Sequence, residues 1–135
     1  MAGKKTIQPE GLFNSVQYGF SQVVVTQPGR MVFISGQVAW NENEVIHGKN
    51  DLAEQTRVSL EKLELAVKAA GGTLDDIVML RIYKVNYQPG DGPVIGKILR
   101  ETFGTEHPPA SSWISVAGLA NPDFMIEIEA QAVLH

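Results

Sequence analysis

Two carboxylates near the end of the chain, Glu127 and Glu129, are the residues best placed by type and spacing to do chemistry. They alternate with Ile126 and Ile128 in the run Phe124–Val133, a period of two that is typical of a half-buried β-strand. Both carboxylates should therefore lie on the same face of a sheet. Like charges this close repel each other unless that face neutralises or uses them. A carboxylate can also accept a proton from water, so this strand is the predicted chemical centre.

A second strand is predicted at Trp113–Val116, directly after a Pro-Pro corner. Ser111, Trp113 and Ser115 are two residues apart in turn, so they should share one strand face. An indole offers a flat apolar surface and one N–H donor. Trp113 is therefore either a core residue or a platform for a ligand, and the sequence leaves both interpretations open.

Gly36 interrupts a predicted strand, Met31–Ala39. A glycine inside a strand marks a bulge, or it lets another group approach the backbone closely. The bulge is the simpler interpretation, and a close approach would make Gly36 part of a site.

Several kinds of site lack their sequence signatures. His47, His107 and His135 do not have the spacing of metal ligands, so we expect them to be loop residues. The chain has no cysteine, no GxSxG motif and no glycine-rich phosphate loop. No metal or cofactor is expected.

Composition favours one globular domain spanning residues 1–135, with 44% hydrophobic and 19% charged residues. The lack of cysteine fits a reducing cytoplasm, and the N-terminal residues lack the apolar region of a signal peptide. The apolar runs Val23–Val25 and Met31–Ile34 are too short to span a membrane. A net charge of −4 argues against a nucleic-acid surface.

The N-terminal part is expected to hold a β-hairpin after a loose lead-in over Met1–Gly11. Its strands would be Phe20–Thr26 and Met31–Ala39, joined by the turn Gln27–Arg30. A polar loop, Asn41–Asn50, should follow.

Two helices are expected further along. Asp51 should cap the first, which ends at Gly71, and the second should run from Pro93 to Gly104. Between them lies a predicted strand, Ile77–Tyr87, on which Arg81 occupies an otherwise apolar face and requires a partner. The resulting order, ββαβαββ, predicts an α+β domain with two helices packed on a mostly antiparallel sheet.

The chain resembles the RidA (YjgF) family of small imine and enamine deaminases. The resemblance covers nearly the whole chain, and it is carried by Ser35-Gly36-Gln37, the helix with its Gly71-Gly72 ending, Leu74–Val78 and Ile126–Ala130. It implies a chorismate-mutase-like fold, a homotrimer whose sheets form a central barrel, and three clefts between subunits. It also implies hydrolysis of 2-imino acids without metal or cofactor.

The chain departs from the family pattern at the clamp for the substrate carboxylate. Active members carry Pro-Ala-Arg-Ser, whereas Ser111 stands here in place of the arginine. A hydroxyl gives one neutral hydrogen bond where a guanidinium gives a charged fork. The family's tyrosine corresponds to Phe20, its asparagine falls near Gly96, and a small residue is replaced by Trp113.

By resemblance, Glu127 would direct the attacking water, and Gly36 would border the cleft together with Phe20, Ser111 and Trp113. The sequence therefore predicts a small-metabolite-binding trimer that prefers neutral or cationic planar ligands and deaminates 2-imino acids weakly. Arg81 is a candidate substitute for the missing arginine. The rival hypotheses are a binding or regulatory trimer without turnover and, less favoured because of the acidic balance, an endoribonuclease.

Overall fold

The computed structural model describes residues 3–135 and contains six strands, two α-helices and two 3₁₀ turns. The order is β1 (Lys4–Ile7), η1 (Ser15–Tyr18), β2 (Val23–Thr26), β3 (Arg30–Gln37), α1 (Leu52–Ala69), η2 (Leu74–Asp76), β4 (Ile77–Val85), α2 (Asp91–Phe103), β5 (Ala110–Val116) and β6 (Ile126–Leu134). The predicted order ββαβαββ is confirmed, with β1 as an additional first strand.

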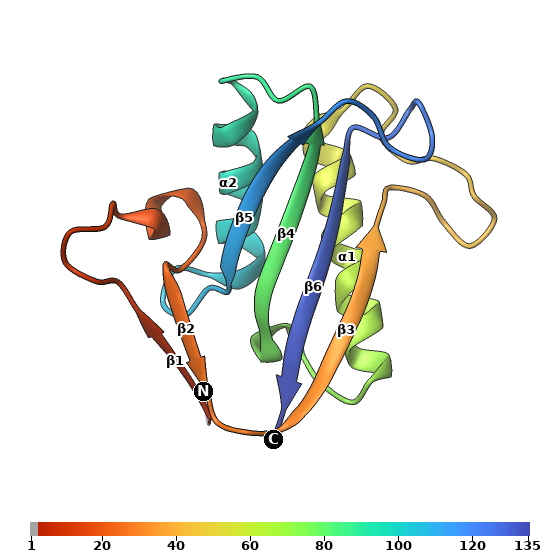
Figure 1. Cartoon of the computed structure of the whole chain (residues 1–135). Helices are drawn as coiled ribbons and strands as arrows, with labels where there is room; N and C mark the ends of the chain where they lie inside the picture. The colour runs from red at the N-terminus through yellow and green to blue at the C-terminus, as the bar shows by residue number, and fades with distance from the viewer. Residues whose placement is uncertain (1–2) are drawn as a thin grey trace.

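Four strands form the main sheet in the order β3-β6-β4-β5 (Figure 1). β6 pairs antiparallel with both β3 and β4, and only β4 and β5 run parallel. Both helices lie on one face of this sheet, and its other face is free of helices (Figure 1). The predicted α+β class is confirmed.

The predicted N-terminal hairpin is wrong. β2 pairs antiparallel with β1, within the stretch expected to be a loose lead-in, and β3 pairs with β6 at the other end of the chain. The Pro28-Gly29 turn separates the strands: Gly29 lies against the backbone of Leu134, where a side chain would collide with the carbonyl oxygen. β6 offers β3 a long, buried partner, whereas β2 is only four residues long.

Hydrogen bonds between residues close in sequence define the start of α1 and the turn that follows it. The Asp51 carboxylate accepts a hydrogen bond from the Glu54 backbone at 3.1 Å, an N-cap interaction, and the helix ends at Ala69. Its surface carries a Glu64–Lys68 ion pair at 3.4 Å, at the favourable i,i+4 spacing. The Thr73 amide donates to the Asp76 carboxylate at 2.8 Å and holds the turn that leads into β4.

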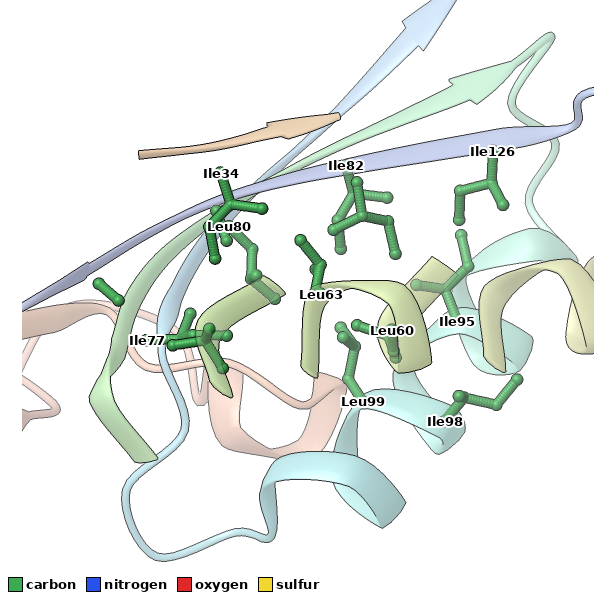
Figure 2. Close-up of a cluster of buried hydrophobic side chains, with 14 residues drawn as sticks. Ile34, Leu60, Leu63, Ile77, Leu80, Ile82, Ile95, Ile98, Leu99 and Ile126 are labelled. Carbon is green, nitrogen blue, oxygen red and sulfur yellow. The ribbon is translucent and has the colours of Figure 1, made fainter. Parts of the chain in front are cut away.

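The core lies between the sheet and the two helices (Figure 2). Ile82 and Ile126 point from the sheet toward Leu63 of α1 and Ile95 of α2, and all four are buried. Along β4 and β6 every second residue is buried against the helices. The residues between them face the helix-free side, which we call the open face. This alternation decides where each candidate site residue lies.

No helix within residues 3–135 combines the length and the apolar character that a membrane span requires.

Candidate functional site

Glu127 and Gly36 lie together on the open face. Glu127 is on β6 and has Tyr83 of β4 as its cross-strand neighbour. The pairing of β3 with β6 shifts between Ile34 and Gln37, so Gly36 sits in the predicted irregularity of the strand. A Cβ atom at Gly36 would overlap the Glu127 carboxylate. The strand is irregular at Gly36, and the Glu127 side chain occupies the space that glycine leaves.

Glu129 is engaged by a neighbouring strand. The Tyr83 hydroxyl donates a short hydrogen bond to its carboxylate, and this bond raises the pKa of Tyr83 above the usual value, with burial and the negative charge of Glu129 acting in the same direction. Arg81 is the cross-strand neighbour of Glu129, and its charge opposes that rise. Glu129 thus has two neighbours that offset the repulsion expected between the glutamates: the phenol of Tyr83 and the positively charged Arg81 on the adjacent strand. Glu127 is left as the carboxylate next to Gly36.

Ser111, Trp113 and Phe20 form a second group. The Trp113 Nε1–H donates to the Ser111 hydroxyl at 2.8 Å, and the Phe20 ring lies 5.8 Å from the indole, tilted by 54°. This hydrogen bond fixes the orientation of the indole. In this bond Ser111, which stands in place of the arginine of active deaminases, is the acceptor.

The two groups lie on opposite faces of the sheet within one chain. Ser111 and Trp113 are paired with Leu80 and Ile82, which are buried against the helices, whereas Glu127 is paired with Tyr83 on the open face. β4 separates the strands of the two groups, which adds a lateral distance of about 10 Å. One chain therefore does not bring all five predicted site residues into a single cleft. Arg81 is paired with Ser112, so it lies on the open face and away from Ser111.

Three aromatic residues near Trp113 were not singled out from the sequence. Phe13, Tyr18 and Tyr87 line a cavity of about 320 Å³ together with Phe20 and Trp113. Phe13 and Tyr18 belong to the segment before β2, which the sequence did not place against β5. The only available signal was the density of aromatic residues between positions 13 and 20.

A buried ion pair was also missed. Lys84 lies on the helix-covered face of β4 with only 8% of its side chain exposed, and its ammonium contacts the Asp91 carboxylate at 3.1 Å. The ammonium also donates to the Val85 carbonyl at 2.7 Å. The Asp91 carboxylate in turn accepts a hydrogen bond from the backbone N–H of Gln88 at 2.8 Å. The pair ties the end of β4 to the start of α2, so it holds the turn that carries Tyr87.

Gly96 lies in α2 and packs against the segment before β2 that carries Phe13 and Tyr18. The family's asparagine falls near this position. A Cβ atom there would lie 3.0 Å from the Tyr18 carbonyl oxygen, and one at Gly19 would lie 2.7 Å from the Leu99 Cβ. Gly19 has φ +94°, a conformation that favours glycine. The two glycines let the segment pack directly on the helix, and Gly96 contributes no functional group to the cleft.

The histidines take part in ordinary contacts. His107 Nδ1 lies 3.1 Å from the Thr6 hydroxyl, and His135 Nε2 lies 3.0 Å from the Gln27 carbonyl. Over residues 3–135, no three histidine, cysteine or acidic side chains come together as metal ligands would.

Comparison with known proteins gives a consistent result. The family model described as endoribonuclease L-PSP matches residues 14–134. The 3-aminoacrylate deaminase RutC of Acinetobacter baylyi is 31% identical over 129 residues, which cover 96% of this chain and 97% of RutC.

Solved structures agree with this result. YyfB from Yersinia pestis, a protein of unknown function of the conserved Rid family, has a TM-score of 0.93 at 40% identity, covering 98% of this chain and 99% of that chain. The YjgF gene product of E. coli has a TM-score of 0.66 at 34% identity, covering 82% and 85%. The resemblance in the sequence is thereby confirmed, and this chain belongs to the RidA/YjgF family.

Proposed function

We propose that this protein is a cytoplasmic homotrimer that binds a small uncharged or cationic metabolite in clefts between its subunits. In each cleft, Glu127 and Gly36 of one subunit face Phe20, Ser111 and Trp113 of another. The proposal further holds that an imine- or enamine-type substrate is hydrolysed there, with Glu127 directing the water. It is supported by the placement of the two residue groups on opposite faces of one sheet, because only a second copy can complete a site that uses both.

The chemistry needs no group beyond the substrate, water and these side chains. Glu127 accepts a proton from water as the water oxygen bonds to the imine carbon. Glu127 returns this proton to the nitrogen, which gives a carbinolamine. The hydroxyl proton of the carbinolamine then moves to the nitrogen as the carbon–nitrogen bond breaks, so ammonia leaves and a carbonyl compound forms. An enamine enters this route as its imine tautomer. RutC, named for its action on the enamine 3-aminoacrylate, is a relative at 31% identity and supports this reaction class.

Ser111 supports an unusual substrate preference within this class. Its hydroxyl already accepts a hydrogen bond from Trp113, and a hydroxyl carries no charge to pair with a carboxylate. Losing a charge-assisted bidentate contact costs about 1.5–3 kcal/mol, roughly tenfold to a hundredfold in affinity. We therefore expect 2-iminobutanoate to be turned over at least about tenfold more slowly than by a relative that carries the arginine. Equal rates would contradict this expectation, and Ser111→Arg should raise carboxylate affinity.

The test of Glu127 compares two carboxylates on the same strand. The protein is incubated with freshly generated imines, and ammonia is measured. Glu127→Gln should lower the rate about a hundredfold, the lower end of the usual contribution of a general base. Glu129→Gln is the matched control and should retain the rate. If both variants match the wild type, Glu127 does not direct water. If no imine releases ammonia although a ligand binds, the trimer without turnover is the correct function.

Ribonuclease activity, which the description of the family model suggests, is not favoured here. A phosphate backbone is held mainly by lysine and arginine. The net charge is −4, and none of the five proposed site residues is basic.

A further inference from the structure

Five aromatic side chains line the open cavity of about 320 Å³ beside β5, and we call them the aromatic cage: Phe13, Tyr18, Phe20, Tyr87 and Trp113. Phe13 and Tyr18 form its exposed rim. Four of the rings form a connected chain, and Tyr87 lines the same cavity. Phe13 lies 6.1 Å from Tyr18 and 6.2 Å from Phe20 between ring centroids, and Phe20 lies 5.8 Å from Trp113. The cage therefore joins the segment before β2, the turn after β4 and strand β5.

The ring planes do not form a slot. Successive pairs are inclined by 58°, 75° and 54°, so neighbouring rings meet as walls at steep angles. A flat ligand is held best between parallel faces, whereas inclined faces surround a compact, rounded group. The geometry therefore favours a compact ligand over an extended planar one.

The electrostatics of the cage favour a positive charge. Each ring presents a face of negative potential, and none of the five side chains carries a formal charge. The indole N–H of Trp113 is already donated to Ser111, so it is not free to bind an anion. An anion would lose its hydration without a charged partner, whereas an organic cation gains attraction to the ring faces.

Backbone contacts hold the cage in place before a ligand arrives. The Tyr87 amide donates to the Ser115 hydroxyl at 3.0 Å, and the Asn86 amide donates to the Val116 carbonyl at 2.9 Å. On the other side, the Ser15 hydroxyl donates to the Phe20 carbonyl at 2.7 Å. The backbone that carries Tyr87 and Phe20 is thus held before binding, which lowers the entropic cost of binding at these two positions.

We propose that the aromatic cage binds a compact organic cation, such as an alkylated ammonium or a protonated amine. Phe13, Tyr18 and Tyr87 are then binding residues that add to Phe20 and Trp113. This inference rests on the proposed function, because those two residues belong to the same cleft. It narrows the ligand from uncharged or cationic to cationic, and it replaces the planar ligand expected from the sequence with a compact one.

The test uses two probes of nearly equal shape, choline and its uncharged analogue 3,3-dimethyl-1-butanol. The protein carries Trp40→Phe, which keeps an aromatic ring beside Phe124 and leaves Trp113 as the only indole. Each probe is titrated at constant ionic strength while the emission of Trp113 is recorded. Choline should give a saturable change and bind roughly threefold to thirtyfold more tightly than the alcohol, the range expected for cation–π contacts. Equal or tighter binding of the alcohol, or no saturable response to choline, overturns the proposal.

Ring substitutions identify the residues responsible. Phe13→Leu and Tyr87→Leu keep apolar surface but remove the ring quadrupole. Each should therefore lower the affinity for choline severalfold and leave the affinity for the alcohol almost unchanged. Tyr87→Phe should bind choline like the parent. Leu65→Ala, which alters a 63% exposed side chain on α1 away from the cage, is the control and should have no effect. If leucine at both cage positions leaves the preference for choline intact, the cage is not the cation site.

Failure of this inference is distinguishable from failure of the proposed function. If the alcohol binds as well as choline while Glu127→Gln abolishes ammonia release, the cage proposal is wrong and the hydrolase proposal stands. If choline is preferred but Glu127→Gln is fully active, the cage proposal stands and the assigned role of Glu127 is wrong.

Discussion

Glu127 and Glu129 show how two identical residues, two positions apart, acquire different surroundings. Glu129 accepts a hydrogen bond from Tyr83, whereas Glu127 lies against the backbone at Gly36. Sequence periodicity placed both carboxylates on one face but did not separate their roles, because the separation depends on which residues β4 and β3 bring beside them. A side chain at position 36 would displace Glu127 and leave Glu129 untouched.

The Tyr83–Glu129 bond has a measurable consequence at alkaline pH. The bond favours the protonated phenol in the folded state, so the pKa of Tyr83 lies above its usual value of 10.0. Its stabilising effect is complete below the pKa of the unfolded chain and is lost as pH rises through the higher, folded value. The difference in phenolate absorbance between wild type and Tyr83→Phe should have a midpoint above 10.0.

Glu129→Gln is the control for this titration, because the hydrogen bond to Glu129 is the largest cause of the rise. The midpoint should move down in that variant. A wild-type midpoint at or below 10.0 would show that the bond is not formed in solution.

At the scale of the elements, the segment that carries three of the five rings of the aromatic cage packs on α2 through two glycines. Gly96 brings the helix backbone against Tyr18, and Gly19 fits a left-handed conformation above Leu99. The family's asparagine falls near position 96, and the glycine here has a packing role. Restoring the family's asparagine would therefore push the segment away from the helix.

Gly96→Asn should destabilise the protein by about 1–3 kcal/mol, because the added side chain meets a backbone oxygen that cannot move freely. Gly90→Asn is the matched control: position 90 has no heavy atom near its Cβ and an ordinary φ of −72°, so the change should stay within about 0.5 kcal/mol. Urea denaturation measures both variants. Equal stabilities would show that the segment does not rest on Gly96.

How far the sequence predicts this fold depends on whether a signal is local. The N-cap at Asp51 and the period of two along β6 are local signals, and each was confirmed. Strand partners are set by distant residues, so β3 was paired with the wrong strand. The site shows the same division. The common face of Ser111, Trp113 and Ser115 follows from period two, but Phe13 and Tyr18 reach Trp113 only because the chain folds back on itself.

At the scale of the whole molecule, both helices cover one face of the sheet and leave apolar side chains on the other. Phe33 is 70% exposed, Met31 54% and Ile114 38%, and all three lie on the open face or its edge strands. Met31 and Phe33 are neighbours on the outer face of β3, whereas Ile114 lies on the opposite edge strand. Exposed apolar surface of this kind marks a site of association. Association of open faces from several copies would bury it, in agreement with the proposed trimer.

The oligomeric state is tested with two variants, each of which introduces one negative charge on a different side of the sheet. Wild type should sediment with the mass of three 14.7 kDa chains, and Phe33→Glu should dissociate because it places a carboxylate in the interface. Leu65→Glu alters a side chain that is 63% exposed on α1, away from the open face, and should remain a trimer. A monomer mass for wild type at micromolar concentration would contradict the proposal.

The placement of Glu127 and Trp113 on opposite faces of one sheet also predicts that variants at the two positions complement each other. If each cleft draws the two residues from different chains, Glu127→Gln and Trp113→Ala damage different halves of it. Two defective chains refolded together should regain both residues in roughly a quarter of their clefts if they mix at random. Mixing without subunit exchange should restore nothing, and no recovery after refolding would place the whole site within one chain. Two inactive alleles expressed in one cell would then complement each other.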